Sequence, residues 1–144
     1  MDAGIIFKIC NMAALAAWIL LIVFPGKSYT RVFTVSIMSS LVFAIAYTIS
    51  IGISFGTKGG FGSLEEVALL FQNPYALLAG WIHYLAFDLF VGSWISAHAA
   101  KHSISRWLIL PCQFLTFMFG PIGLMSYFLL RVLIRRETIF EQPF

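Results

Sequence analysis

Four long apolar runs constrain this chain more than any other feature. They extend from about Ala3 to Phe24, Val32 to Phe55, Pro74 to His98 and Trp107 to Leu133. A helix needs about 20 mostly apolar residues to cross the roughly 30 Å hydrocarbon core of a bilayer, and backbone polar groups in lipid must be satisfied internally. The pattern therefore predicts an all-α membrane protein with four transmembrane helices, forming a single domain over residues 1–144.

Composition and charge agree with a lipid environment. Hydrophobic residues make up 60% of the chain and charged residues only 10%, whereas soluble domains carry about 25% charged residues. The net charge of +3 comes from basic residues that stand singly or in pairs between the apolar runs. We expect membrane lipids as partners and no nucleic acid, because no basic stripe is present. In a four-helix arrangement the two sides carry nearly equal Lys and Arg, so the positive-inside rule does not set the orientation.

The segment between the second and third runs has the pattern of a short helix. Ser63 and Glu66 form a capping box, and apolar residues follow at helical spacing. We expect an amphipathic helix that lies at the membrane interface. Asn73 and Pro74 then suit the N-cap and first position of the third span.

The third run carries two ionisable residues near its centre, His83 and Asp88. A central Asp costs about 2.5–3.5 kcal/mol on insertion scales, so such residues default to functional hypotheses. A five-residue separation places them about 140° apart around a helix. The alternative is that Asp88 accepts a hydrogen bond from a neighbouring helix and has a structural role.

Two stripes run along this helix. Trp81, Tyr84, Asp88 and Gly92 share a face of polar and small residues, and His83, Phe87, Phe90 and Trp94 share an aromatic face. Together the stripes can flank a groove for a flat apolar molecule, although aromatic side chains at this spacing are also typical of plain packing. Polar side chains on other segments extend the candidate binding set to Tyr47, Glu66, Gln113 and Thr116.

The fourth run is interrupted at Gly120-Pro121. Pro121 has no N–H to donate to the carbonyl of Phe117, so the helix must kink or break there. The freed carbonyl can bind a polar ligand group, or the kink can be structural.

The standard chemical motifs do not appear. Gly59-Gly60-Phe61-Gly62 is not followed by the lysine of a P-loop. A single metal held by His83, Asp88 and a glutamate is conceivable, but the chain lacks a zinc-type His pair. We expect no metal and no cofactor.

Three motifs, in this order, resemble the abscisic-acid-deficient 4 family of membrane proteins. They are the Ser63–Val67 segment, the Ala79–Gly92 string with its Gly-Trp-Ile-His and Asp-Leu-Phe-Val-Gly parts, and Leu115–Leu124. The resemblance covers nearly the whole chain. It implies a four-helix membrane protein linked to carotenoid biosynthesis, since the plant member is required for the synthesis of neoxanthin from violaxanthin.

The implied reaction is a redox-neutral isomerisation of an epoxy-carotenoid, or of a related long isoprenoid, to an allenic product. It needs an acid at the epoxide oxygen and a base at the adjacent vinylic carbon, and an apolar site can keep a carboxyl group neutral. Position and chemistry suggest Asp88 as acid and His83 as base, or the reverse. The alternative function is non-catalytic: a protein that binds pigment or lipid, or that assists a carotenoid enzyme. We also consider a second copy or such an enzyme as a partner.

The location implied is a multi-pass position in a bacterial inner, thylakoid-type or plastid membrane. No transit peptide precedes the first run, which suggests a bacterial relative or a trimmed mature form.

Overall fold

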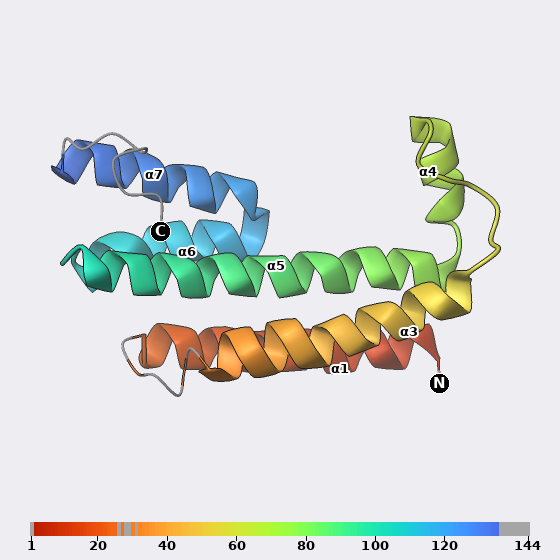
Figure 1. Ribbon diagram of the computed structural model, residues 1–144, viewed down its shortest axis with the longest axis horizontal. Coiled ribbons are helices and arrows are strands. Elements are labelled where there is room, and N and C mark those ends of the chain that lie inside the picture. The colour runs from red at the N-terminus through yellow and green to blue at the C-terminus, as the bar shows by residue number, and fades with distance from the viewer. Residues whose placement is uncertain (1, 26, 28–29, 31, 136–144) are drawn as a thin grey trace.

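The computed structural model describes residues 2–25, 27, 30 and 32–135. Its helices are α1 (Ala3–Val23), the π-helix η1 (Val32–Phe43), which continues into α3 (Ala44–Ser54), then α4 (Leu64–Leu70), α5 (Pro74–Lys101), α6 (Arg106–Phe119) and α7 (Pro121–Arg135). Figure 1 shows α1, η1–α3 and α5 as long neighbouring rods, with α6 and α7 beside the second half of α5. Among the described residues, three helices are long and apolar enough to cross a membrane: α1, the combined η1–α3 rod, and α5.

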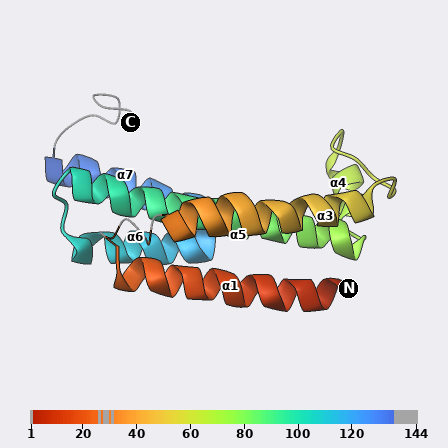
Figure 2. The ribbon, with the colours of Figure 1, turned by 60° about the horizontal axis from the view of Figure 1, so that its bottom comes forward.

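The fourth predicted span, about Trp107 to Leu133, is not one helix. It divides at Gly120 into α6 and α7, which fold back against each other as a hairpin (Figures 1 and 2). Gly120 adopts a φ of +45°, in the left-handed region that favours glycine. With 14 and 15 residues, the two helices are each about 21–23 Å long at 1.5 Å per residue, less than the roughly 30 Å of hydrocarbon.

Close packing at a second glycine holds the hairpin together. A Cβ atom added to Gly123 would lie 2.1 Å from the backbone nitrogen of Thr116. The first turn of α7 therefore rests directly on the backbone of α6, as small residues allow in membrane helices.

The predicted short helix is present as α4. The Ser63 hydroxyl accepts a hydrogen bond from the backbone N–H of Glu66 at 3.2 Å, as the capping box requires. None of its residues is buried, and Figure 1 shows it crossing the direction of α5 at one end of the molecule. At the start of α5, the Asn73 side chain accepts from the backbone N–H groups of Tyr75 and Ala76, and Pro74 takes the first position. Both predicted caps are confirmed.

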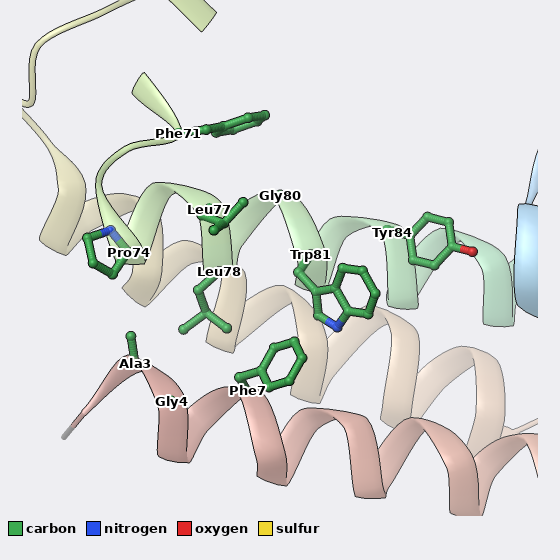
Figure 3. Close-up of a pocket in the computed structure, with 10 residues that line it drawn as sticks. All are labelled: Ala3, Gly4, Phe7, Phe71, Pro74, Leu77, Leu78, Gly80, Trp81 and Tyr84. Atoms are coloured by element: carbon green, nitrogen blue, oxygen red, sulfur yellow. The ribbon is translucent and has the colours of Figure 1, made fainter. Parts of the chain in front are cut away.

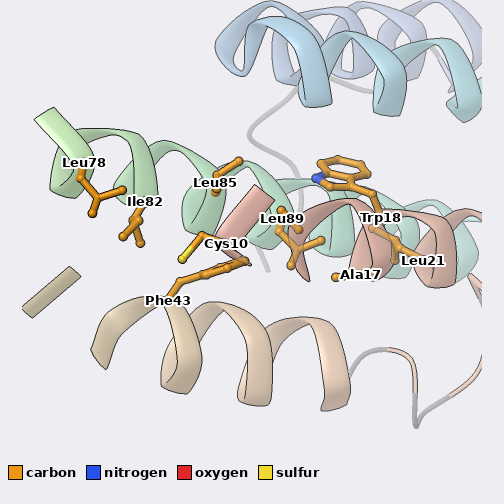
Figure 4. Close-up of a cluster of buried hydrophobic side chains, with 10 residues drawn as sticks. Cys10, Ala17, Trp18, Leu21, Phe43, Leu78, Ile82, Leu85 and Leu89 are labelled. Carbon is orange, nitrogen blue, oxygen red and sulfur yellow. The ribbon is translucent and has the colours of Figure 1, made fainter. Parts of the chain in front are cut away.

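The largest buried cluster lies where α1, η1 and α5 meet. Figure 4 draws its side chains, which include Trp18, Phe43 and Leu89. The Trp18 ring occupies the space that a side chain at position 92 would need, because a Cβ on Gly92 would lie 2.3 Å from it. Gly92 thus sets how closely α1 approaches α5.

Candidate functional site

Asp88 lies in the middle of α5 and is turned toward the hairpin. Its side chain is 8% exposed, and its Oδ2 atom has no hydrogen-bond partner among the described residues. A Cβ on Gly120 would lie 2.7 Å from its Oδ1 atom. The carboxyl group therefore packs against the α6–α7 turn, at a point where a larger residue than glycine would displace it.

The helix break frees the carbonyl of Phe117, and the Tyr84 side chain binds this carbonyl. The Tyr84 hydroxyl donates to this carbonyl oxygen at 3.3 Å, which supplies the partner that Pro121 cannot. The same hydroxyl interacts with the Asp88 side chain, one turn further along α5. Tyr84, Asp88 and the helix break thus form one polar site inside the bundle.

An apolar groove runs along α5 up to this site. It has a volume of about 570 Å³ and lies between the start of α1, the end of α4 and the first half of α5. Figure 3 shows its lining: Ala3, Gly4, Phe7, Phe71, Pro74, Leu77, Leu78, Gly80, Trp81 and Tyr84. The Trp81 indole N–H donates to the Asn11 side chain at 2.8 Å, and the Phe7 ring lies 5.6 Å from the Trp81 ring. The groove is therefore aromatic, with its polar atoms at Trp81 and Tyr84.

His83 faces a different neighbour. Its exposed ring stacks on Phe87, with centroids 4.5 Å apart, and lies 5.9 Å from the ring of Tyr47 on α3. Asp88 instead faces the α6–α7 turn. The structure confirms that the two residues lie on different faces of α5 and does not bring them into one polar cluster.

The remaining candidate residues are dispersed. Trp94 stacks on His98 with centroids 4.8 Å apart, and Phe87 is exposed. Gln113 donates to the Ser96 hydroxyl at 2.7 Å, and Thr116 donates to the Cys112 carbonyl at 2.8 Å, so both polar groups are used within the bundle. Glu66 lies on α4, where it accepts from the Gly62 N–H. From the predicted set, the structure brings together Trp81, Tyr84 and Asp88 in one group. It brings together Tyr47, His83 and Phe87 in another.

A second polar cluster was missed from the sequence. Buried His98 shares a hydrogen bond of 2.7 Å between its Nδ1 atom and the Tyr127 hydroxyl, and the His102 ring lies 4.3 Å from the His98 ring. Arg131, one turn beyond Tyr127, is only 2% exposed. His98 and His102 are four residues apart, and so are Tyr127 and Arg131. This spacing was the feature of the sequence that could have indicated the cluster. The cluster joins the end of α5 to α7.

The described residues contain no group of three or more His, Cys, Asp or Glu side chains that could hold a metal ion. Asp88 is the carboxyl group of the site, with an aromatic hydroxyl beside it and an apolar groove leading to it. Such an arrangement can transfer a proton to or from an apolar molecule that carries one oxygen atom.

Comparison with known proteins gives a consistent family. The model for the family described as ABA DEFICIENT 4-like matches residues 5–127. Protein ABA DEFICIENT 4, chloroplastic, from Arabidopsis thaliana is 23% identical over 150 residues, which cover 94% of this chain and 64% of the relative. The chain thus spans less than two thirds of that relative's length. No solved structure matches. Since the family match extends over most of the chain and includes α5, α6 and the first half of α7, this protein belongs to the ABA DEFICIENT 4-like family.

Proposed function

We propose that this protein acts in carotenoid metabolism, as an integral multi-pass membrane protein that isomerises an epoxy-carotenoid or a related isoprenoid. The observation that carries the proposal is the Asp88 carboxyl group, buried at the middle of an apolar helix with an unpartnered oxygen. Membership of the ABA DEFICIENT 4-like family supports the carotenoid-related role.

The outer surface supports a position within the bilayer. Large apolar side chains such as Met12, Leu15 and Ile53 are exposed along α1 and α3, where water would penalise them and lipid would not. In this arrangement three helices span the membrane, and the α6–α7 hairpin enters it and returns. Broken helices at membrane depth are tolerated where they are covered by protein, and here α5 covers the break. A plastid, thylakoid-type or bacterial inner membrane would each suit this arrangement.

The proposed chemistry needs proton transfer at two neighbouring atoms of the substrate. Asp88 is suited to it because an apolar environment favours the neutral carboxyl group, which can donate a proton and later accept one. His83 lies with Phe87 and Tyr47 on another face of α5. We therefore assign the proton chemistry to the Asp88 site, and any role of His83 to a different part of the bound molecule.

Expression in a host that accumulates epoxy-carotenoids tests the proposal. Pigments extracted from cells with the wild-type protein, the Asp88→Asn variant and an empty vector are compared by chromatography. Wild type should convert epoxide into an isomer of equal mass, and Asp88→Asn should lose this conversion while still accumulating in the membrane. Asp2→Asn is the matched control, since it makes the same chemical change at an exposed position outside the helices. Equal conversion by wild type and Asp88→Asn would contradict the role of Asp88.

A second candidate function is pigment binding without turnover. The observation in its favour is the groove itself, because its lining is almost entirely apolar and carries no ionisable group apart from the Tyr84 phenol. This function predicts that purified protein retains a polyene absorbance while pigment profiles stay unchanged. Filling the groove with Gly80→Trp should then remove the absorbance; Gly52→Trp, at a site with open space around it, is the matched control.

A further inference from the structure

The groove meets Tyr84 before it reaches Asp88. Tyr84 is among the residues that line the groove, whereas Asp88 is not. Figure 3 shows the Tyr84 ring at the end of the groove farthest from Pro74, with its hydroxyl directed onward, away from the other lining residues. A long molecule that lies in the groove and extends toward the carboxyl group must therefore pass the Tyr84 oxygen.

The Tyr84 hydroxyl is held in place by two groups. The Phe117 carbonyl accepts its hydrogen bond at 3.3 Å, and the Asp88 side chain interacts with it. The distance to the carbonyl is long for an O–H···O hydrogen bond, so an incoming oxygen of the substrate can compete for the same proton. Tyr84 is half-buried, between the groove and the bundle interior.

Other polar atoms near the groove are less suitable. The Trp81 indole N–H is already donated to Asn11, and an indole N–H cannot accept a proton afterward. The His83 ring lies against Phe87 and Tyr47 and does not line the groove.

We propose that Tyr84 is the catalytic residue that contacts the substrate oxygen, and that Asp88 acts behind it as a positioning residue. This inference rests on the proposed function, and it moves the proton transfer within that site from the Asp88 carboxyl group to the neighbouring Tyr84 hydroxyl. The substrate is an epoxide at the end of a conjugated isoprenoid chain, with its chain along the groove and its oxygen toward the α6–α7 turn.

The step balances within the site. The Tyr84 hydroxyl gives its proton to the epoxide oxygen, the bond between this oxygen and the carbon that bears the chain breaks, and its electron pair stays on the oxygen as a new hydroxyl group. The resulting allylic cation loses the proton of the adjacent vinylic carbon to the Tyr84 phenolate, and that C–H pair forms the second double bond of an allene. Tyr84 is restored, and no oxidant or reductant is needed. The neutral Asp88 carboxyl group donates a hydrogen bond to the phenolate oxygen while it exists.

The test compares Tyr84→Phe with wild type in the same pigment-converting host. We expect conversion to fall by about 10²–10⁴-fold, the usual contribution of general acid–base catalysis, while purified protein retains as much bound pigment as wild type. Tyr75→Phe is the matched control, since it removes a phenol hydroxyl from the first turn of the same helix, outside the groove lining. Unchanged conversion by Tyr84→Phe, with Asp88→Asn inactive, would overturn the role of Tyr84 and leave the proposed function standing. No conversion by wild type would overturn both.

A second variant separates catalysis from support of the Phe117 carbonyl. Site-specific fluorotyrosine at position 84 keeps the hydroxyl and its hydrogen bond but makes the phenol more acidic. If Tyr84 transfers the proton, the pH profile of conversion should move to lower pH. An unmoved profile with full activity would show that the hydroxyl serves only the helix break, and would overturn the proposal even if Tyr84→Phe fails to accumulate.

Discussion

The hairpin makes a sharp prediction for Gly123→Ala. The added methyl group would lie 2.1 Å from the backbone nitrogen of Thr116 and 2.2 Å from its hydroxyl oxygen. Non-bonded atoms normally approach to about 3.5–4.0 Å, so α6 and α7 would have to separate by more than about 1 Å. Overpacking of this kind costs about 1–3 kcal/mol. Because backbone has to move, rather than the tip of a side chain, we expect a loss of about 3 kcal/mol in the free energy of unfolding.

Gly52→Ala is the matched control. Gly52 lies within α3, and a Cβ there meets nothing within 4 Å. Alanine is better than glycine in a helix interior by about 1 kcal/mol, so this variant should be as stable as wild type or more stable. Unfolding in mixed micelles, followed by tryptophan fluorescence and circular dichroism over a denaturing-detergent titration, measures both variants.

The sign of the result decides between two structures. In one continuous helix over residues 106–135, Gly123 would be an ordinary interior glycine, and alanine would be neutral or stabilising, as at Gly52. In the hairpin the same change must be destabilising. A Gly123→Ala protein that unfolds at the same detergent concentration as Gly52→Ala would refute the hairpin and the reasoning built on it.

Two further predictions concern topology and the second polar cluster. In the proposed arrangement of three spans and a returning hairpin, the start of α1 and the end of α7 lie on opposite sides of the membrane. Reporters fused to each end of the protein should therefore report opposite compartments, and the same compartment would indicate four spans. Tyr127→Phe removes the partner of the buried His98 Nδ1 atom and should lower the free energy of unfolding by about 1–3 kcal/mol. Unfolding measured against the wild type should reveal the difference, and equal stability would mean that the bond contributes little.

Local features were predictable because local contacts determine them. The caps at Ser63 and Asn73 each depend on hydrogen bonds to backbone groups two or three residues away, so the sequence pattern contains all the partners. The helical nature of the apolar runs follows from the lipid solvent in the same way. The separation of His83 from Asp88 required only the geometry of a single helix.

The reversal at Gly120 was not predictable by those means. Hydropathy is continuous across residues 107–133, and Pro121 indicates only that the helical hydrogen bonding is interrupted. Whether the chain kinks or turns back depends on what packs against the break. Here Gly123 lies on the backbone near Thr116, and Asp88 and Tyr84 occupy the turn. Gly123 and Thr116 are close in the sequence, but Asp88 and Tyr84 lie on α5, and Tyr84 is 33 residues away from its hydrogen-bond partner Phe117.

In the candidate site, too, some features could be predicted from the sequence and others depend on the packing of the helices. The polar stripe containing Tyr84 and Asp88 and the freed carbonyl of Phe117 were both visible in the sequence, but their meeting was not, because it depends on how the hairpin packs on α5. The aromatic stripe was also real, yet its neighbour on α3 is Tyr47, which lies against His83 and not against Asp88. Helix periodicity assigns residues to faces, whereas only the packing tells what each face meets.

The hairpin also changes the distribution of charge across the membrane. Because α7 returns to the end at which α5 finishes (Figure 1), this end collects Lys27, Lys101, Arg106 and Arg131, while Lys8 and Lys58 belong to the other end. A four-span chain balances these charges, but the hairpin does not. The positive-inside rule then predicts that the Lys101 end faces the compartment from which the protein is inserted. The apolar groove lies at the opposite end of α5. In the proposed arrangement, an isoprenoid substrate therefore enters from the leaflet that faces away from the compartment from which the protein is inserted, with its oxygenated end directed toward the centre of the bundle.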